Sequence, residues 1–207
     1  FEAKRRMNSG VTAKRITGGN SEFIKAIALN AQKLGVKIIL NAKIKQISHT
    51  AKSVKVSFND KRGRTQNLSA DKLVCTIPFS VLREVKFLPA LPVSKMNAIN
   101  NLAYTKSTKT YMQGSRFEWD RRNIGSSVWT DSTLERIFSM FGKRGDERGI
   151  FASWTEGEGA VLPESMNDEE RQNWTKNEFE KILPFMKGAI ERTATKSWTK
   201  DEFSKGA

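Results

Sequence analysis

Few side chains in this sequence have the types and spacing that catalysis requires. His49 is the only histidine and Cys75 the only cysteine among the 207 residues. A Ser-His-Asp triad or a metal site therefore has almost nothing to be built from, and an intrachain disulfide is impossible. No G-x-G-x-x-G or Walker pattern occurs, so Gly18-Gly19 is not a phosphate loop. We expect no metal site.

Two lysines stand in a stretch, residues 104–113, whose pattern is typical of a β-strand. Alternate residues of a strand share a face, so Lys106 lies with Thr108 and Thr110, whereas Lys109 lies with Tyr111. The residue types alone favour an edge strand with both lysines in water.

The chain is organised around residues 71–92, which read D-K-L-V-C-T-I-P-F-S-V-L-R-E-V-K-F-L-P-A-L-P. The short apolar run at 72–77 predicts a buried strand. Pro78 cannot donate to a ladder and ends that strand. Ser80 is placed to cap a short helix. By residue type this is an ordinary strand–helix joint.

The preceding residues predict a helix followed by a β-meander. Asn20 is a natural N-cap and Gly35 a natural stop for the helix. Strands are expected at 36–40, 41–47 and 53–58, and a return strand at 68–77, with a polar hairpin tip at 59–64.

The following residues predict a second sheet with helices. A helix at 94–102 should turn Ala98, Ile99 and Leu102 inward. Apolar strands are expected at 136–141 and 149–154, joined by a charged loop, and a helix should run from Asn167 to Pro184. The fold class that we predict is α+β with a mixed sheet.

Composition indicates a globular chain with an uneven charge. Hydrophobic residues make up 38% and charged residues 28%, and no apolar run approaches the ~20 residues that span a bilayer. The net charge is +14, and residues 1–67 hold 15 Lys/Arg against 3 Asp/Glu. The alternative to an enzyme is therefore a non-catalytic basic module that binds nucleic acid or another polyanion through residues 1–67. No targeting segment is visible, which leaves the cytoplasm as the default compartment.

Several spaced motifs, taken together and in order, resemble the flavin-containing amine oxidases, the family of the monoamine oxidases and L-amino acid oxidases. They are V-C-T-I-P-F-S-V-L-R, then F-L-P-A-L-P, then T-K-S-T-K-T-Y-M-Q before R-F-E-W, and finally W-T-K-D-E-F-S-K-G-A. The resemblance runs from about residue 15 to the end. It implies a lead-in loop (1–14), part of an FAD-binding domain built from helix and meander (15–101), a mixed-sheet substrate domain (102–195), and a segment that returns toward the flavin (196–207).

The resemblance also implies roles for individual residues. Lys109, followed by Phe117 and Trp119, matches the lysine that in the family holds a water against flavin N5 and assists reaction with O₂; Lys106 is the fallback. Ile44 matches the residue whose backbone meets the adenine of FAD, and Trp198 matches a residue near the flavin.

The implied activity is oxidation of a primary amine or L-amino acid to an imine, with O₂ reduced to H₂O₂. Where L-amino acid oxidases carry a substrate-contacting tyrosine, this chain has Ser139 or Met140, so the amino acid contact is left open.

The implied partners are a small-molecule amine or amino acid and O₂, with no metal, membrane span or nucleic acid; a homodimer is left open. The family's Gly-rich pyrophosphate loop and C-terminal acidic motif are not in these residues, so the chain by itself is expected to be inactive. A degenerate relative kept as a partner subunit is a further alternative.

Overall fold

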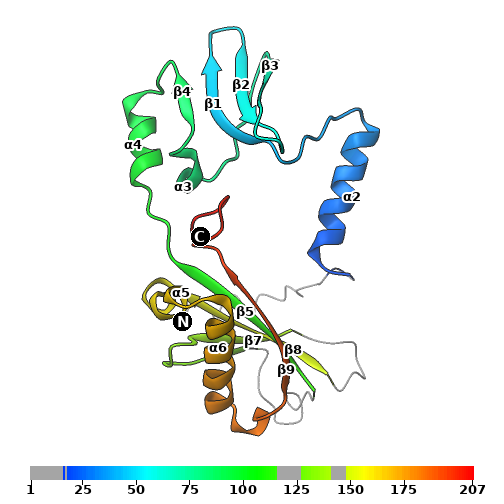
Figure 1. The fold of residues 1–207 in the computed structure, drawn as a ribbon, viewed down its shortest axis with the longest axis vertical. Coiled ribbons are helices and arrows are strands. Elements are labelled where there is room, and N and C mark those ends of the chain that lie inside the picture. Colours follow the sequence, from blue (N-terminus) through cyan, green and yellow to red (C-terminus); the bar gives the residue numbers. More distant parts are fainter. Residues whose placement is uncertain (1–15, 17, 116–126, 141–147) are drawn as a thin grey trace, which may run out of the picture. The chain divides into compact units, whose positions relative to one another are not determined.

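The computed structural model describes residue 16 and residues 18–115, 127–140 and 148–207 (Figure 1). The lead-in loop 1–14, Phe117 and Trp119, and most of the charged loop expected at 142–148 lie outside these residues. The chain divides into two compact units, residues 1–44 with 57–67, and residues 45–56 with 68–207. The secondary structure is α+β and contains two sheets.

The first unit contains the expected helix, α2 (Asn20–Lys33). It begins one residue earlier than a cap at Asn20 would require, since Gly19 is the N-cap and makes no side-chain hydrogen bond. Gly35 follows the helix with a φ of 85°, a left-handed backbone that suits a residue without Cβ. No residue of α2 is buried, and its apolar face is more than half exposed at Phe23 and Ile24.

The first sheet has the strand order β3-β2-β1-β4. The meander is confirmed as β1 (Lys43–His49), β2 (Val54–Asn59) and β3 (Thr65–Ala70). The polar tip between β2 and β3 closes on Asp60, whose carboxylate accepts from the backbone N–H groups of Arg62 and Arg64. The edge strand β4 (Lys86–Leu88), which the sequence did not predict, pairs in parallel with β1.

Two of the predicted strands are wrong. Residues 36–40 and 72–77 belong to no described strand, and the return strand stops at Ala70. Both segments are exposed, for example Leu40 at 77% and Val74 at 86%. The apolar composition was read correctly as strand-like, but a strand also needs a hydrogen-bonded neighbour, which composition does not reveal.

The helices after Pro78 also depart from expectation. α3 (Phe79–Leu82) begins where Pro78 predicted, but Ser80 does not cap it; its hydroxyl donates to the carbonyl of Ser204 instead. α4 (Val93–Asn101) buries Ile99 but leaves Ala98 and Leu102 exposed.

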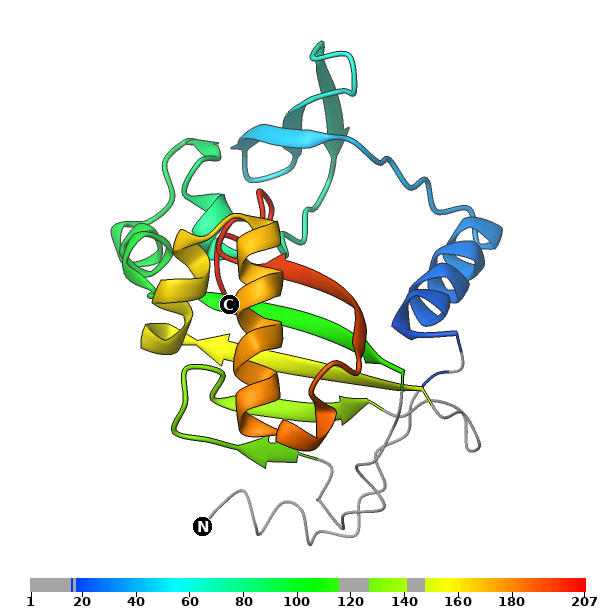
Figure 2. The same ribbon diagram turned by 60° about the horizontal axis from the view of Figure 1, so that its bottom comes forward.

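The second sheet has the strand order β6-β7-β8-β5-β9 (Figure 2). Its members are β5 (Ser107–Gly114), β6 (Ser127–Trp129), β7 (Arg136–Met140), β8 (Gly149–Glu156) and β9 (Ile190–Ser197). All of the described pairings between its strands are antiparallel, and the one parallel contact is an isolated bridge between Glu135 and Trp154. The mixed sheet expected here is therefore wrong for these strands; the parallel strand pair lies in the first sheet. β6 and β9 were not predicted.

Helix α6 (Asp168–Ile182) covers one face of this sheet (Figures 1 and 2). Its start follows the sequence prediction: Asn167 accepts from Glu170 N–H, and the Glu170 carboxylate accepts from Asn167 N–H, a reciprocal capping box. Phe179 packs against Phe151 of β8, with ring centres 5.2 Å apart and ring planes tilted by 51°. These two rings anchor a core completed by Met112, Leu134, Ile137, Leu183, Met186, Ala189 and Ile190.

Shorter elements complete the second unit: η2 (Gly157–Ala160), α5 (Val161–Ser165) and η3 (Pro184–Met186). Among the described helices, none is long and apolar enough to cross a membrane.

Candidate active site

Lys109 lies in the middle of the second sheet rather than on an edge strand. Its strand β5 is flanked by β8 and β9, and Lys109 pairs with Trp154 on one side and Lys196 on the other. Trp154 in turn pairs with Arg136 of β7, which pairs with Trp129 of β6. Directly paired residues share a face, so one residue from each of the five strands forms a single row, Lys196–Lys109–Trp154–Arg136–Trp129. We call this set the cation–aromatic row.

The cation–aromatic row lies on the face opposite α6. The neighbours of Lys109 in sequence, Thr108 and Thr110, point the other way: Thr110 receives a hydrogen bond of 3.3 Å from Thr175 of α6. The edge-strand reading of Lys109 is therefore wrong, because β9, which the sequence did not reveal, completes the sheet beyond β5.

Two of the three cations in the row already have acidic partners. Arg136 Nη2 lies 2.5 Å from the Glu156 carboxylate, and Lys196 Nζ lies 2.5 Å from Asp201. The hydrogen bond from Lys196 lowers the pKa of Asp201 below its usual value, helped by the backbone N–H of Phe203. In the part of the chain that the structure describes, no carboxylate lies within ion-pair distance of Lys109.

An aromatic ring takes the place of an acid beside Lys109. Its Nζ stands 4.0 Å from the ring centre of Trp154, while the Arg136 guanidinium carbon lies 4.5 Å from the same centre. The indole N–H donates to the Ser107 hydroxyl over 3.1 Å. Lys109 is half-buried, so it is partly removed from water, and no described acidic side chain neutralises its charge. Such an ammonium suits a ligand that is electron-rich or that develops negative charge.

Trp198 lies close to the same face. Its backbone N–H donates to Ser107 O over 2.9 Å, directly after β9, and its ring centre is 5.4 Å from Lys196 Nζ. Trp198 is 38% exposed. The structure thus brings Lys109 and Trp198 to neighbouring positions of one sheet face.

The two substrate candidates fall on opposite faces. Met140 alternates with Phe138 and Arg136 and is half-buried on the face of Lys109. Ser139 is 2% exposed on the α6 side, and its hydroxyl has no hydrogen-bond partner among the described residues. Of the two, only Met140 lies on the face that carries Lys109.

The other two candidates are Ile44 and Lys106. Ile44 is half-buried in β1 and belongs to the first unit, whereas Lys109 belongs to the second. Lys106 is exposed just before β5, and its carbonyl accepts from Gly157 N–H at the end of β8. The fallback lysine therefore faces solvent.

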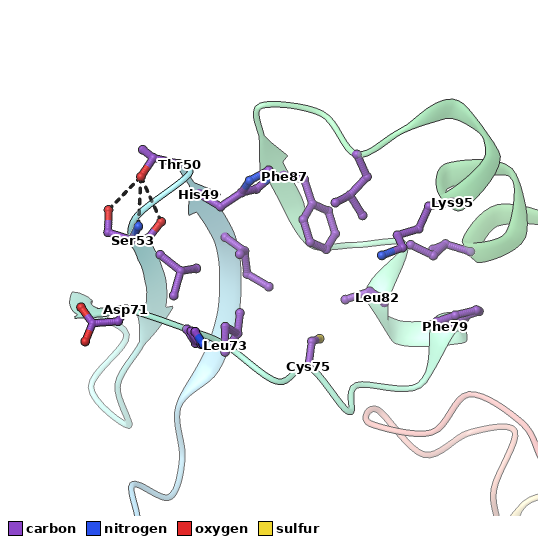
Figure 3. A pocket seen from close by; sticks show the side chains of 15 residues that line it. His49, Thr50, Ser53, Asp71, Leu73, Cys75, Phe79, Leu82, Phe87 and Lys95 are labelled. Carbon is purple, nitrogen blue, oxygen red and sulfur yellow. Dashed lines mark hydrogen bonds between the residues drawn. The ribbon is translucent and has the colours of Figure 1, made fainter.

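A cavity of about 660 Å³ lies elsewhere in the second unit (Figure 3). It is lined from one side by His49 of β1 and from the other by Leu82 and Phe87, with Cys75 below them. His49 Nε2 is buried and unpaired among the described residues. No group of three possible metal ligands occurs in the described part of the chain. The cavity shares no residue with the cation–aromatic row.

Comparison with known proteins identifies the family. The sequence pattern of the flavin containing amine oxidoreductases matches residues 3–207. The chain belongs to this family. An L-amino-acid oxidase of Siganus canaliculatus is 27% identical over 207 residues, and the flavin-dependent L-tryptophan oxidase RebO of Lentzea aerocolonigenes is 24% identical over 198. These matches cover 97% and 93% of this chain but only 39% and 41% of the relatives, so the chain spans about 40% of their length.

Solved structures agree with the family at the level of the fold. A putrescine oxidase variant superposes with a TM-score of 0.75 at 15% identity, over 92% of this chain and 41% of that chain. Cyclohexylamine oxidase from Brevibacterium oxydans superposes with a TM-score of 0.67 at 14% identity, over 79% and 35%.

The flavin amine oxidoreductases use FAD, and the residues of the cation–aromatic row suit the flavin end of this cofactor. A half-buried lysine that has no acidic partner among the described residues, with the Trp154 indole beside its ammonium, suits a flavin ring that gains negative charge on reduction. The chain carries no Gly-rich loop for the pyrophosphate end. Trp154 and Arg136 were missed from the sequence because only the strand register makes them neighbours of Lys109.

Proposed function

We propose that this chain is part of an FAD-dependent oxidase that converts a primary amine or an L-amino acid to an imine. Two electrons and two protons leave the C–N unit of the substrate, and O₂ takes up both to become H₂O₂. Family membership over residues 3–207 carries the proposal, and the names of the L-amino-acid oxidase relatives support it. Because the chain spans about 40% of those relatives, the activity is that of a complete oxidase.

FAD, when bound, supplies the redox chemistry by accepting a hydride and passing the electrons to O₂. Lys109 is the proposed catalytic residue. Its ammonium would hold a water and stabilise the negative charge that O₂ acquires. A fixed cation in a site that excludes water is worth several times more than in bulk solvent. The absence of an acidic partner among the described residues supports this role, since a paired lysine would already be neutralised.

The remaining roles follow the same proposal. Ile44 would meet the adenine of FAD through its backbone, Trp198 would lie by the flavin, and Met140 would contact substrate. Met140 is apolar and cannot donate a hydrogen bond to a substrate carboxylate, in contrast to a tyrosine. The apolar side chain of Met140 favours an amine substrate, while the curated relatives favour an L-amino acid. The proposal therefore includes both substrate classes.

The domain plan is part of the proposal. Residues 15–101 would contribute to the FAD-binding domain, 102–195 to the substrate domain, and 196–207 would return toward the flavin. Two contacts support the return: the Ser80 hydroxyl donates to Ser204 O, and Lys205 pairs with Glu84 at the end of α3.

The test is the flavin content and oxidase activity of the intact protein. We expect a flavin absorbance spectrum that survives desalting, and H₂O₂ released with at least one primary amine or L-amino acid. A desalted protein that cannot be loaded with FAD, or a loaded protein that oxidises neither class, would contradict the proposal. Tight, steeply salt-dependent binding to a polyanion by such a protein would favour the basic-module alternative.

A further inference from the structure

The cation–aromatic row contains a residue to which neither the sequence nor the comparisons give a role. We propose that Trp154 is the positioning residue for Lys109, holding its ammonium over the indole face without neutralising it. This inference rests on the proposed function of Lys109 in the reaction with O₂. Trp154 would act through Lys109 rather than on substrate.

The choice of an indole over a carboxylate has a physical reason. A lysine side chain has four rotatable bonds and does not stay in one place unless something holds its end. An acid would hold it but cancel the charge that the reaction needs. A tryptophan face attracts a cation through its quadrupole and leaves the net charge unchanged. The 4.0 Å between Nζ and the ring centre is well inside the range of this attraction.

Trp154 is itself fixed from several directions. Its N–H donates to Ser107, two residues before Lys109 on the same strand. Phe138 lies with its ring centre 6.4 Å away. Arg136 stacks on the indole and is tied to Glu156, so this second cation is oriented by an acid. The ring therefore offers a stationary surface to a mobile ammonium.

The row offers a matched control in its second lysine–tryptophan pair. Lys196 also lies over an indole, that of Trp198, but at 5.4 Å and with Asp201 as its ion-pair partner. Removing the Trp198 ring should therefore leave the position of Lys109 unchanged. Trp154→Phe is the conservative variant, since it keeps a smaller aromatic face that attracts a cation less strongly and loses the hydrogen bond to Ser107.

The first readout needs no flavin. In the intact protein with ¹³C-methylated lysines, the Lys109 methyl signals, assigned with Lys109→Arg, should be displaced upfield by the indole ring current. Trp154→Leu should return them to the position of an exposed lysine, Trp154→Phe should keep part of the displacement, and Trp198→Leu should not move them. Undisplaced signals in the parent protein, or signals unmoved in Trp154→Leu, would overturn the inference. Should Trp154→Leu not fold, Trp154→Phe and the parent protein decide.

The second readout is the rate at which the reduced, FAD-loaded protein reacts with O₂. Trp154→Leu should slow this reaction about tenfold, and Trp154→Phe only about twofold. If Trp154→Leu reacts with O₂ at the parent rate while Lys109→Met reacts much more slowly, the role of Trp154 is overturned and the role of Lys109 stands. An unchanged rate in Lys109→Met is the failure of the proposed function itself, which the methyl signals do not report.

Discussion

At the scale of single residues, the sequence predicted Lys109 but not its surroundings. The motif that led to Lys109 is local, whereas Trp154 and Arg136 reach it through the register of three strands. Register depends on which strands pair, and pairing is a long-range property. The same holds for the buried carboxylate of Glu164, whose partners are 56 and 33 residues away.

Glu164 joins the central strand to its neighbour on the α6 side of the sheet. It accepts hydrogen bonds from Thr108 of β5 and, over 2.7 Å, from Ser197 of β9. Glu164→Ala leaves both buried hydroxyls without this acceptor and should lower the free energy of unfolding by about 2–4 kcal/mol. Glu164→Gln keeps one acceptor and should cost less. Urea unfolding measures the stability of both variants. The control is Glu158→Ala, at an exposed position six residues before Glu164. Equal midpoints for all three variants would refute a structural role.

Asp201 gives a prediction about pH. Its carboxyl pKa is lowered chiefly by the hydrogen bond from Lys196. A lowered pKa means that the ionised form is favoured by folding, so this contribution is present above the usual aspartate pKa and is lost as the pH falls through the lowered value. Carbon-detected NMR titration should give a pKa that rises toward the usual value in Lys196→Ala. A titration curve unchanged by that substitution would contradict the pairing.

At the scale of elements, local signals predicted well and partner-dependent ones did not. The start of α6 at Asn167 and the hairpin tip at Asp60 are encoded within four or five residues, and both were confirmed. The strands expected at 36–40 and 72–77 depend on a neighbouring strand and were wrong. β9 was missed because I-E-R-T-A-T-K-S is largely polar, yet this strand pairs with β5, and its Thr193 hydroxyl donates a hydrogen bond to Gln172 of α6.

The α6 capping box predicts a stability change that is local to the helix. Asn167→Ala removes the acceptor for Glu170 N–H and should cost about 1 kcal/mol. The comparison is Asn177→Ala, at an exposed position inside α6, where alanine's higher helix propensity should leave stability equal or slightly raised. Thermal unfolding followed by circular dichroism distinguishes the two. A larger loss for Asn177→Ala than for Asn167→Ala would be inconsistent with the cap.

At the scale of the whole molecule, the fold agrees with the family, but some apolar side chains of this chain are exposed to solvent. α2 buries no residue, and residues 36–40 and 72–77 are exposed apolar segments. Their composition is typical of buried strands and of a packed helix. The described residues of this chain do not bury them. The chain spans about 40% of its curated relatives, and the proposed complete oxidase would provide that environment.

Cys75 tests the exposure of 72–77 directly. The thiol is exposed, so in the folded 207-residue chain it should react with a maleimide nearly as fast as in urea. The buried strand that composition predicts would instead protect it. Cys75→Ser, which removes the only thiol, sets the background. Reaction that requires unfolding would show that the segment is paired and buried.

The central claim is that Lys109 serves the reaction of a reduced flavin with O₂, and rapid mixing of the reduced, FAD-loaded intact protein with O₂ tests it most directly. Lys109→Met removes the ammonium and keeps a chain of similar length. A removed catalytic charge of this kind typically costs 10²–10³-fold, so we predict a loss of about that size. Lys106→Met, at an exposed position three residues earlier, should react at the parent rate. An undiminished rate in Lys109→Met, with FAD still bound, would contradict the account.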